Sequence, residues 1–523
     1  MVKHILKYTM GSGNNLFSLK RNIDSFIVGL LGVLLIYMFT KHGGIGLEPD
    51  SIAYLGTARN VVHGNGFMDL DGFPLIDFPL GYPAFLSLVL FITRVDLLQT
   101  GQFINMLLYF CLIYLSGGII NHISTKNSWV KIPFLLLIVF SPAMLGIYTM
   151  LLSETLFLVL TLLFFMALHY YGQYKTIKWL IIVAVIAGVS CLVRYAGVTL
   201  IGAAGLMILL DRKLPGKKKI GHLALLGILG SAFWIANLFR NYLITNMMMG
   251  DRQKSYTSLY KNIENYSNVF GDFFYLHSFP TVFIVLIGVS FFVFYIYSHI
   301  IHIYKTNRYY NYWNILAVYF IVYALFMVLS STFSRFETLD MRLLSPLYLP
   351  CVLPFTFVIT WLISKQISWR KYGLVAFFSL LFVIISYGQY RDNCDLYDMA
   401  EHNGLPGYAE DRWKNSKLMD YIIQHKDRFN EDTRIYSNGN EAVYLFTGLK
   451  AEALPNRIIK EDNEYFIGDN LAAYYLVWVQ DNAGLDSLSF KRLLNSDKYI
   501  LLSNHPEGKI YFHPLPVKDQ PKK

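Results

Sequence analysis

Long apolar segments separated by short polar ones occupy the chain up to about residue 390. A helix needs about 20 mainly apolar residues to cross a bilayer, and about eleven segments meet that requirement. The expected spans are about 23–41, 102–120, 132–150, 155–171, 178–194, 197–211, 220–242, 279–303, 312–331, 343–363 and 372–389. The pattern therefore predicts an α-helical polytopic membrane protein.

One further stretch, "FPLGYPAFLSLVLFITRV" (78–95), is apolar but short for a span. Counting it as a span would reverse the side of every later loop and put the basic "DRKLPGKKK" (211–219) outside. Because Lys and Arg concentrate in cytoplasmic loops, the charges favour a helix lying at the outer membrane interface. The N-terminus is then cytoplasmic. The segments expected outside are 42–101, 145–154, 243–278, 332–342 and the tail from about 390.

The tail has a different pattern, with more charge and with short β-type runs between helical ones. The runs are "RIYSN", "YYLVWV", "KYILLSN" and "KIYFHPL", and "WKNSKLMDYIIQH" has helical spacing. This predicts two domains. Residues 1–389 form the membrane domain, whose first external loop (42–101) carries interfacial helices, and residues 390–523 form a small external α/β domain.

Composition agrees with a membrane protein, since 54% of the 523 residues are hydrophobic and 15% are charged, against about 25% charged in soluble domains. The net charge of +10 lies mostly in short gaps between apolar runs. That distribution is a topology signal and not a nucleic-acid surface. The four cysteines are scattered, which fits neither a disulfide framework nor a zinc site. The first apolar run has no small-residue cleavage site after it, so we expect a retained helix.

The loop after the first span, "GLEPDSIAYLGTARNVVHGNGF" (46–67), places acidic residues at the water boundary. In a helix over 48–67, Asp50, Tyr54 and Ala58 share one face. Asp50 near the helix N-terminus is favoured by the helix dipole, so Asp50 as a simple cap is one reading and Asp50 as a functional group is the other. The following glycines and prolines (64–83) predict a tightly turned return to the membrane.

The stretch "PDSIAYLGTARNVVHGNGF…GFPLIDFPLGYP" resembles the first external loop of GT-C-fold membrane glycosyltransferases. The nearest likeness is to bacterial relatives of protein O-mannosyltransferases and of lipid A aminoarabinose transferase. The resemblance continues through "YTMLLSETLF" (148–157), "LVRYAG" (192–197), "FRNYL" (239–243) and "DMRLLSPLYLP" (340–350). Several relatives have an Asp-Glu pair where this chain has Asp50-Ser51, with Glu48 two residues earlier.

The resemblance implies a GT-C fold in a bacterial inner membrane and a polyprenyl-phosphate-linked sugar donor. It also implies transfer at the external face to a lipid, glycan or protein acceptor, with membrane lipids around the chain. Such a transfer is a single displacement that inverts the anomeric carbon. It needs a base for the acceptor proton and cations for the departing phosphate.

Two carboxylates are the candidate catalytic residues. Asp50 matches the acidic residue of the family loop, and a general base contributes typically 10²–10⁴-fold. Glu154, at the start of an expected span, matches a second acidic position in relatives. An acidic residue inside a membrane helix is costly, and such residues usually have a function. The alternative for Glu154 is that Ser153-Glu154 caps the helix. A further alternative is that one divalent cation binds between Asp50, Glu154 and the phosphate.

Four arginines, Arg194, Arg240, Arg335 and Arg342, lie at expected external ends of spans, against the positive-inside bias. Their planar forks match phosphate, and Asp340 could orient Arg342. The alternative is snorkelling to lipid headgroups.

Arg59, His63, Tyr54 and Tyr82 could touch sugar or phosphate, although surface solvation and an aromatic belt also account for them. His63 has no partner at metal-ligand spacing. "SNGNEAVYLFTG" (437–448) predicts a strand-to-helix turn at residues 438–440.

Two other classes compete with the glycosyltransferase: a transporter or flippase of a lipid-linked sugar, and a non-catalytic scaffold whose tail recruits partners. Transporters tend to carry charges or broken helices at mid-membrane and to show inverted halves. Here the charges gather at one face and no half-to-half symmetry is visible, which favours the enzyme.

Overall fold

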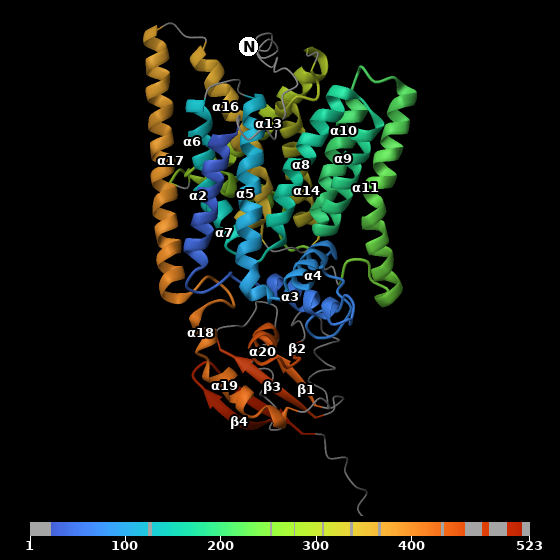
Figure 1. The fold of residues 1–523 in the computed structure, drawn as a ribbon, viewed down its shortest axis with the longest axis vertical. Coiled ribbons are helices and arrows are strands. Elements are labelled where there is room, and N and C mark those ends of the chain that lie inside the picture. Colours follow the sequence, from blue (N-terminus) through green and yellow to red (C-terminus); the bar gives the residue numbers. More distant parts are fainter. Residues whose placement is uncertain are drawn as a thin grey trace, which may run out of the picture. The chain divides into compact units, whose positions relative to one another are not determined.

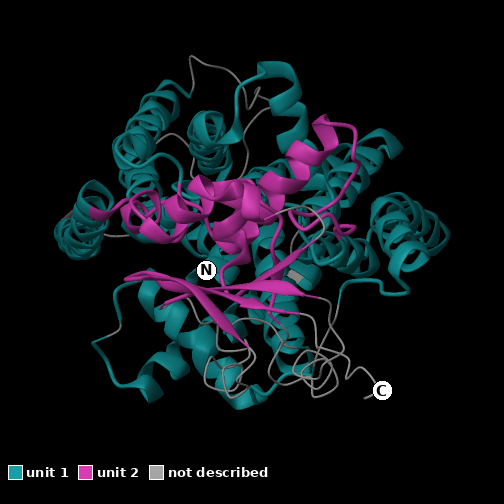
Figure 2. Ribbon diagram, turned by 90° about the horizontal axis from the view of Figure 1, so that it is seen from below, with its two compact units in different colours: residues 1–45, 76–402 teal, residues 46–75, 403–523 magenta. Residues whose placement is uncertain are grey.

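The computed structural model describes residues 22–123, 128–250, 254–276, 278–305, 308–334, 338–364, 368–429, 433–454, 473–480 and 499–514. The chain divides into two compact units, coloured separately in Figure 2. Unit 1 comprises residues 1–45 and 76–402, and unit 2 comprises residues 46–75 and 403–523. Residues 42–101, which the sequence pattern predicts to be the first external loop, are thus divided between the two units.

Unit 1 is a bundle of helices that run roughly along one direction (Figure 1). Its helices are α2 (Ile23–Thr40), α4 (Gly81–Thr93), α5 (Leu97–Ile123), α6 (Ser128–Val139), α7 (Pro142–Tyr148), α8 (Ser153–Tyr174), α9 (Ile177–Val193), α10 (Val198–Leu210), α11 (Gly216–Thr245), α12 (Leu259–Phe273), α13 (Thr281–Lys305), α14 (Tyr312–Phe333), α15 (Met341–Leu344), α16 (Tyr348–Ser364) and α17 (Ser368–Asn403).

Among the described residues, eight helical segments are long and apolar enough to cross a membrane, and nine if α6 and α7 form one span with a 51° bend. Helices lie at all eleven expected spans. Two of them, at 178–194 and 197–211, are shorter apolar helices in the structure. The chain is a multi-pass membrane protein. The ambiguous segment 78–95 forms α4, whose 13 residues are too few for a span.

Burial separates central helices from peripheral ones. α5, α8 and α14 are mostly buried, whereas α11, α13 and α17 expose most of their apolar side chains. In a membrane protein such exposed leucines and valines face lipid, which is as apolar as they are. α17 continues to Asn403, well past the end of the expected span at 389. Its last turns carry the polar residues that had suggested a boundary.

Unit 2 contains a five-stranded mixed sheet in the order β2-β1-β3-β5-β4. The strands are β1 (Arg434–Ser437), β2 (Glu452–Ala453), β3 (Tyr474–Val479), β4 (Ile500–His505) and β5 (Gly508–His513). β1 pairs with β2 and β3 in parallel, while β5 is antiparallel to β3 and β4. The predicted small α/β domain is therefore confirmed.

The helices of unit 2 lie along one face of this sheet (Figure 2). They are α3 (Pro49–Val62), α18 (Asp411–Lys414), α19 (Lys417–Gln424) and α20 (Asn440–Thr447). α19 packs on β4, and α20 packs on β1 and on α3. The turn predicted at residues 438–440 is present, with Asn438 Nδ2 donating to the Val479 carbonyl at 2.7 Å.

The segment that follows α2 is joined to the segment that follows α17. Leu47 and Gly407 form a parallel bridge, and the Tyr408 N–H donates to the Leu47 carbonyl at 2.8 Å. Gly407 has φ +85°, and a Cβ there would collide with the Leu47 carbonyl oxygen. Glycine adopts this backbone conformation without steric cost. This contact gives α3 a fixed place within unit 2.

Candidate functional site

Glu154 is the centre of a charged cluster at one end of the helix bundle of unit 1. It is the second residue of α8, and Leu152, which provides no side-chain hydrogen bond, occupies the N-cap position. The Glu154 side chain is fully buried. Its carboxylate binds two arginines from other parts of the chain. Burial of a charge at this depth requires such partners.

Arg194 reaches Glu154 from the end of α9. It is the C-cap of α9 in extended conformation, followed by the 3-10 turn Tyr195–Gly197. Its Nη1 lies 2.5 Å from Glu154 Oε1 and donates to Ser153 Oγ at 3.1 Å. A Cβ on Gly197 would meet the backbone of Cys191 at 2.4 Å, so glycine permits the tight turn that follows the arginine.

Arg342 reaches the same carboxylate oxygen from α15. Its Nε donates to Glu154 Oε1 at 2.7 Å. Asp340 is the N-cap of this short helix, and its Oδ1 accepts the Leu343 N–H at 2.8 Å. Asp340 therefore acts on Arg342 through the helix backbone that carries it. Tyr323 of α14 adds a second support, since its hydroxyl donates to the Leu343 carbonyl at 2.9 Å.

The three side chains bear one negative and two positive charges, so their net charge is +1. The arginine side chains are 14% and 16% exposed, so each is mostly but not completely buried. Guanidinium groups bind phosphate oxygens in a planar, bidentate geometry. The cluster is therefore suited to an anion with several oxygens.

α4 packs against the end of α9 beside this cluster. A Cβ on Gly81 would lie 2.6 Å from the Leu192 carbonyl oxygen, so glycine is needed for this approach. The next residue, Tyr82, is fully buried. The "GYP" sequence at the start of α4 thus packs closely against the end of α9, where Arg194 is the C-cap.

Arg240 belongs to a different set of contacts near the end of α11. Its Nη1 donates to Asn241 Oδ1 at 2.9 Å. Asn241 Nδ2 donates to the Met248 carbonyl at 2.9 Å, and the Tyr195 hydroxyl donates to the Ile76 carbonyl at 3.3 Å. Arg335 lies outside the described residues.

The remaining candidates, Asp50, Tyr54, Arg59 and His63, all lie on or at the end of α3 in unit 2. The N-cap is Glu48, whose N–H donates to Ser51 Oγ at 3.0 Å, so Asp50 is not the cap. Asp50 is partly exposed in the first turn, and Tyr54 is buried. The exposed His63 ring contacts the Arg59 carbonyl through Nδ1 at 2.8 Å.

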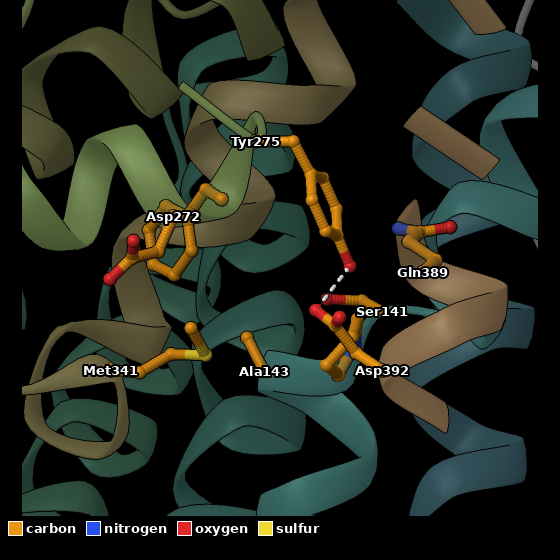
Figure 3. A pocket seen from close by; sticks show the side chains of 9 residues that line it. Ser141, Ala143, Asp272, Tyr275, Met341, Gln389 and Asp392 are labelled. Atoms are coloured by element: carbon orange, nitrogen blue, oxygen red, sulfur yellow. Dashed lines mark hydrogen bonds between the residues drawn. The ribbon is translucent and has the colours of Figure 1, made fainter. Parts of the chain in front are cut away.

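A small pocket of about 120 Å³ lies in unit 1 beside α15 and is lined by both polar and apolar side chains (Figure 3). Met341, the residue before Arg342, lines it together with Asp272 and Asp392. The hydroxyl of Tyr275 donates to Asp392 Oδ2 at 3.0 Å. The sequence reading missed this pocket and the supporting role of Tyr323, because these residues lie far apart along the chain.

Within the described ranges, no three His, Cys, Asp or Glu side chains form a group that could hold a metal ion.

Sequence comparison finds no matching family model and no matching curated protein. Structural comparison finds crystal structures of ArnT from Cupriavidus metallidurans, one bound to undecaprenyl phosphate and one in the apo state. Each match has a TM-score of 0.56 and 9% sequence identity, and covers 93% of this chain and 97% of the ArnT chain. The chain has the GT-C fold. Because the GT-C match spans nearly all of both chains, it includes the membrane helices and the C-terminal unit.

Proposed function

We propose that this protein is a glycosyltransferase that moves a sugar from a polyprenyl phosphate to an acceptor hydroxyl at the external face of the membrane. The observation that carries the proposal is the Glu154–Arg194–Arg342 cluster at one end of a GT-C bundle. ArnT binds undecaprenyl phosphate, and a polyprenyl phosphate is the expected donor lipid here. The positive-inside pattern supports an external cluster and a cytoplasmic N-terminus.

In the proposed reaction the acceptor oxygen attacks the anomeric carbon while the bond from that carbon to the phosphate oxygen breaks. The phosphate leaves with the electron pair, and the configuration inverts. Arg194 and Arg342 stabilise the charge that develops on the phosphate. Such a group is worth typically 10²–10³ in rate. Asp50 takes the acceptor proton, as its match to the family loop suggests.

Glu154 has a positioning role in this scheme. Its carboxylate holds both guanidinium groups at one point, so that neither has to reorganise when the phosphate charge develops. This preorganisation is the main way in which fixed charges accelerate reactions.

The test compares envelope lipids and glycans from cells that make the wild-type chain with those from cells that make Asp50→Asn, by mass spectrometry. The variant replaces the carboxylate with an amide of the same shape. We expect one sugar-modified envelope component that is present with the wild type and missing with the variant at equal chain abundance. An unchanged glycan profile would remove Asp50 from the mechanism.

A further inference from the structure

α17 is attached to the rest of unit 1 through polar side chains in its second half. Gln389 Nε2 donates to the Leu137 carbonyl at 3.0 Å, and Asn393 Nδ2 donates to the Phe140 carbonyl at 2.9 Å. Both carbonyls lie where α6 ends and the chain bends toward α7. The last carbonyls of a helix have no partner within the helix, and the membrane interior offers no water in its place. These two hydrogen bonds therefore fix this part of α17 to the bundle.

The first half of α17 borders an apolar cavity of about 420 Å³. α17 lies at the edge of the bundle (Figure 1). Its residues Val375, Phe378, Phe382 and Ile385 recur at helical spacing and all line the cavity. Residues of α6 and α16 form most of the opposite wall. This half of α17 thus faces a cavity where its second half bonds to protein.

The cavity has the length of the hydrocarbon of one membrane leaflet. From Val375 to Ile385 the helix rises about 15 Å, which is half of a hydrocarbon core of about 30 Å. The volume is within the range of about 300–1,000 Å³ that is usual for ligand sites. Ser379, Leu381 and Val383 line the cavity and are exposed. The cavity is therefore open on the side of α17 that faces lipid.

The end of the cavity near the start of α17 has the features of a lipid headgroup region. Trp129 lines it, and both Trp129 and Trp369 are exposed, as is typical of tryptophans at a membrane interface. Arg370 and Lys371 are exposed as well, and the Arg370 guanidinium lies 5.1 Å from the centre of the Trp369 ring. Lys371 shares a helix face with Val375, four residues later. The two cations are complementary to a lipid phosphate at this end.

We propose that one acyl chain of an anionic phospholipid occupies this cavity, that its phosphate lies at Arg370 and Lys371, and that the lipid holds the first half of α17 to the bundle. The basic residues place this end of the cavity on the expected cytoplasmic side, whereas the proposed sugar transfer takes place at the external face. The lipid is a structural component of the fold and not a reactant. The proposal does not depend on the proposed function.

The first test uses the full chain in phosphatidylcholine vesicles that contain phosphatidylglycerol with a photoreactive diazirine at the end of one acyl chain. Mass spectrometry locates the labelled residues after irradiation. We expect labels on Phe134 and Val352, which line the cavity and are 8% and 3% exposed. Lipid around the bundle does not reach such buried side chains. Labels confined to exposed residues outside the lining, such as Leu380, would overturn the proposal.

The position of the phosphate is tested with the double variant Arg370→Gln and Lys371→Gln. We expect the mole fraction of phosphatidylglycerol that half-saturates labelling of Val352 to rise about tenfold. Arg391→Gln, at an exposed arginine near the other end of the same membrane helix, should keep the wild-type value. An unchanged value in the double variant would overturn the proposal.

Undecaprenyl phosphate is the competitor that distinguishes a structural lipid from a sugar-carrier lipid. Added to the same vesicles, it should leave the labelling of Phe134 and Val352 by phosphatidylglycerol unchanged. Loss of the label on both residues would show that the cavity holds a polyprenyl chain, and would contradict the proposal while leaving the proposed function in place.

Thermal unfolding in detergent tests whether the lipid holds α17. Phosphatidylglycerol at a hundredfold excess over its Kd should raise the Tm of the lipid-depleted wild type by about 2–3 °C. Ser379→Phe places a ring in the cavity from its exposed rim, so we expect a smaller rise. Leu380→Phe, at the adjacent and exposed residue, should respond as the wild type does. No rise in the wild type, or the same rise in Ser379→Phe, would refute the structural role of the lipid.

Discussion

Glu154 Oε1 accepts a hydrogen bond from Arg342 Nε at 2.7 Å, although the two residues are 188 positions apart in the chain. Arg194 binds the same oxygen. A buried ion pair contributes little net stability because desolvation offsets the attraction. The removal of one partner is costly, however, since it leaves buried charge without compensation. This relationship makes the cluster sensitive to substitution in both stability and activity.

Glu154→Gln is expected to lower the free energy of unfolding by about 3–5 kcal/mol, because the two guanidinium groups then lose the buried carboxylate that binds both of them. Denaturant unfolding of the purified chain measures this. The control is Glu264→Gln, which removes a more exposed pair with Lys261 and is expected to cost about 1 kcal/mol or less. Equal losses in the two variants would contradict the account.

Arg342→Lys is expected to reduce kcat/KM for sugar transfer about 10²–10³-fold, because an ammonium cannot bind Glu154 and phosphate with one planar fork. The chain should still fold, as thermal unfolding will show. Arg212→Lys, an exposed change at a residue that lies over the Tyr304 ring, serves as control. Full activity in Arg342→Lys would exclude the arginine from transition-state stabilisation.

Gly81→Ala tests how closely the start of α4 packs on α9. The added methyl would lie 2.6 Å from the Leu192 carbonyl oxygen, so we expect a destabilisation of about 1–3 kcal/mol. Gly227→Ala is the matched change in α11, where a Cβ meets nothing within 4 Å. It is expected to be neutral or to stabilise by about 0.5–1 kcal/mol. Thermal unfolding of both variants in detergent distinguishes these outcomes.

The stability of unit 2 is expected to fall as pH rises. Burial, followed by the neighbouring carboxylates of Asp69 and Glu441, raises the pKa of Asp71 from 3.8 to about 8. Folding therefore favours the protonated form. Its stabilisation is complete below about pH 4 and is lost as pH rises through about 8.

Hydrogen exchange of α3 and α20 amides in the full chain, corrected for intrinsic exchange rates, measures this dependence. Protection should decrease from pH 4 to pH 8 in the wild type and decrease less in Asp71→Asn, where burial still raises the pKa of Glu441. Asp411→Asn, at a more exposed pair with Lys414, should follow the wild type. Protection that rises with pH in the wild type would show that Asp71 is ionised in the folded chain.

The sequence pattern predicts the helices well, because apolar spans and the charges between them depend on local composition. It also predicts that Glu154, Arg194 and Arg342 lie at helix ends on one side. Their meeting at a single carboxylate oxygen depends on how three separate helices pack, which no local pattern encodes. For Asp340 the local pattern was informative but was interpreted differently. An aspartate before a short helical stretch is typical of an N-cap, whereas the sequence analysis gave Asp340 the role of orienting Arg342.

The division of residues 42–101 between the two units could not be predicted from the sequence for a related reason. The bridge between Leu47 and Gly407 is a backbone contact between segments 360 residues apart, and backbone pairing leaves no side-chain signature at such a distance. The end of α17 was missed because polar residues continue a helix as readily as apolar ones once it has started. The chain therefore remains helical to Asn403.

The most direct test of the central claim is a transfer assay with the purified chain in detergent, supplied with undecaprenyl-phosphate-linked sugars and envelope lipids extracted from cells lacking the protein. No bilayer separates two sides in detergent, so a flippase makes no product there. We expect release of undecaprenyl phosphate together with one sugar-bearing product, both lost in Arg342→Lys. Intact donor in the presence of the folded wild-type chain would contradict the account.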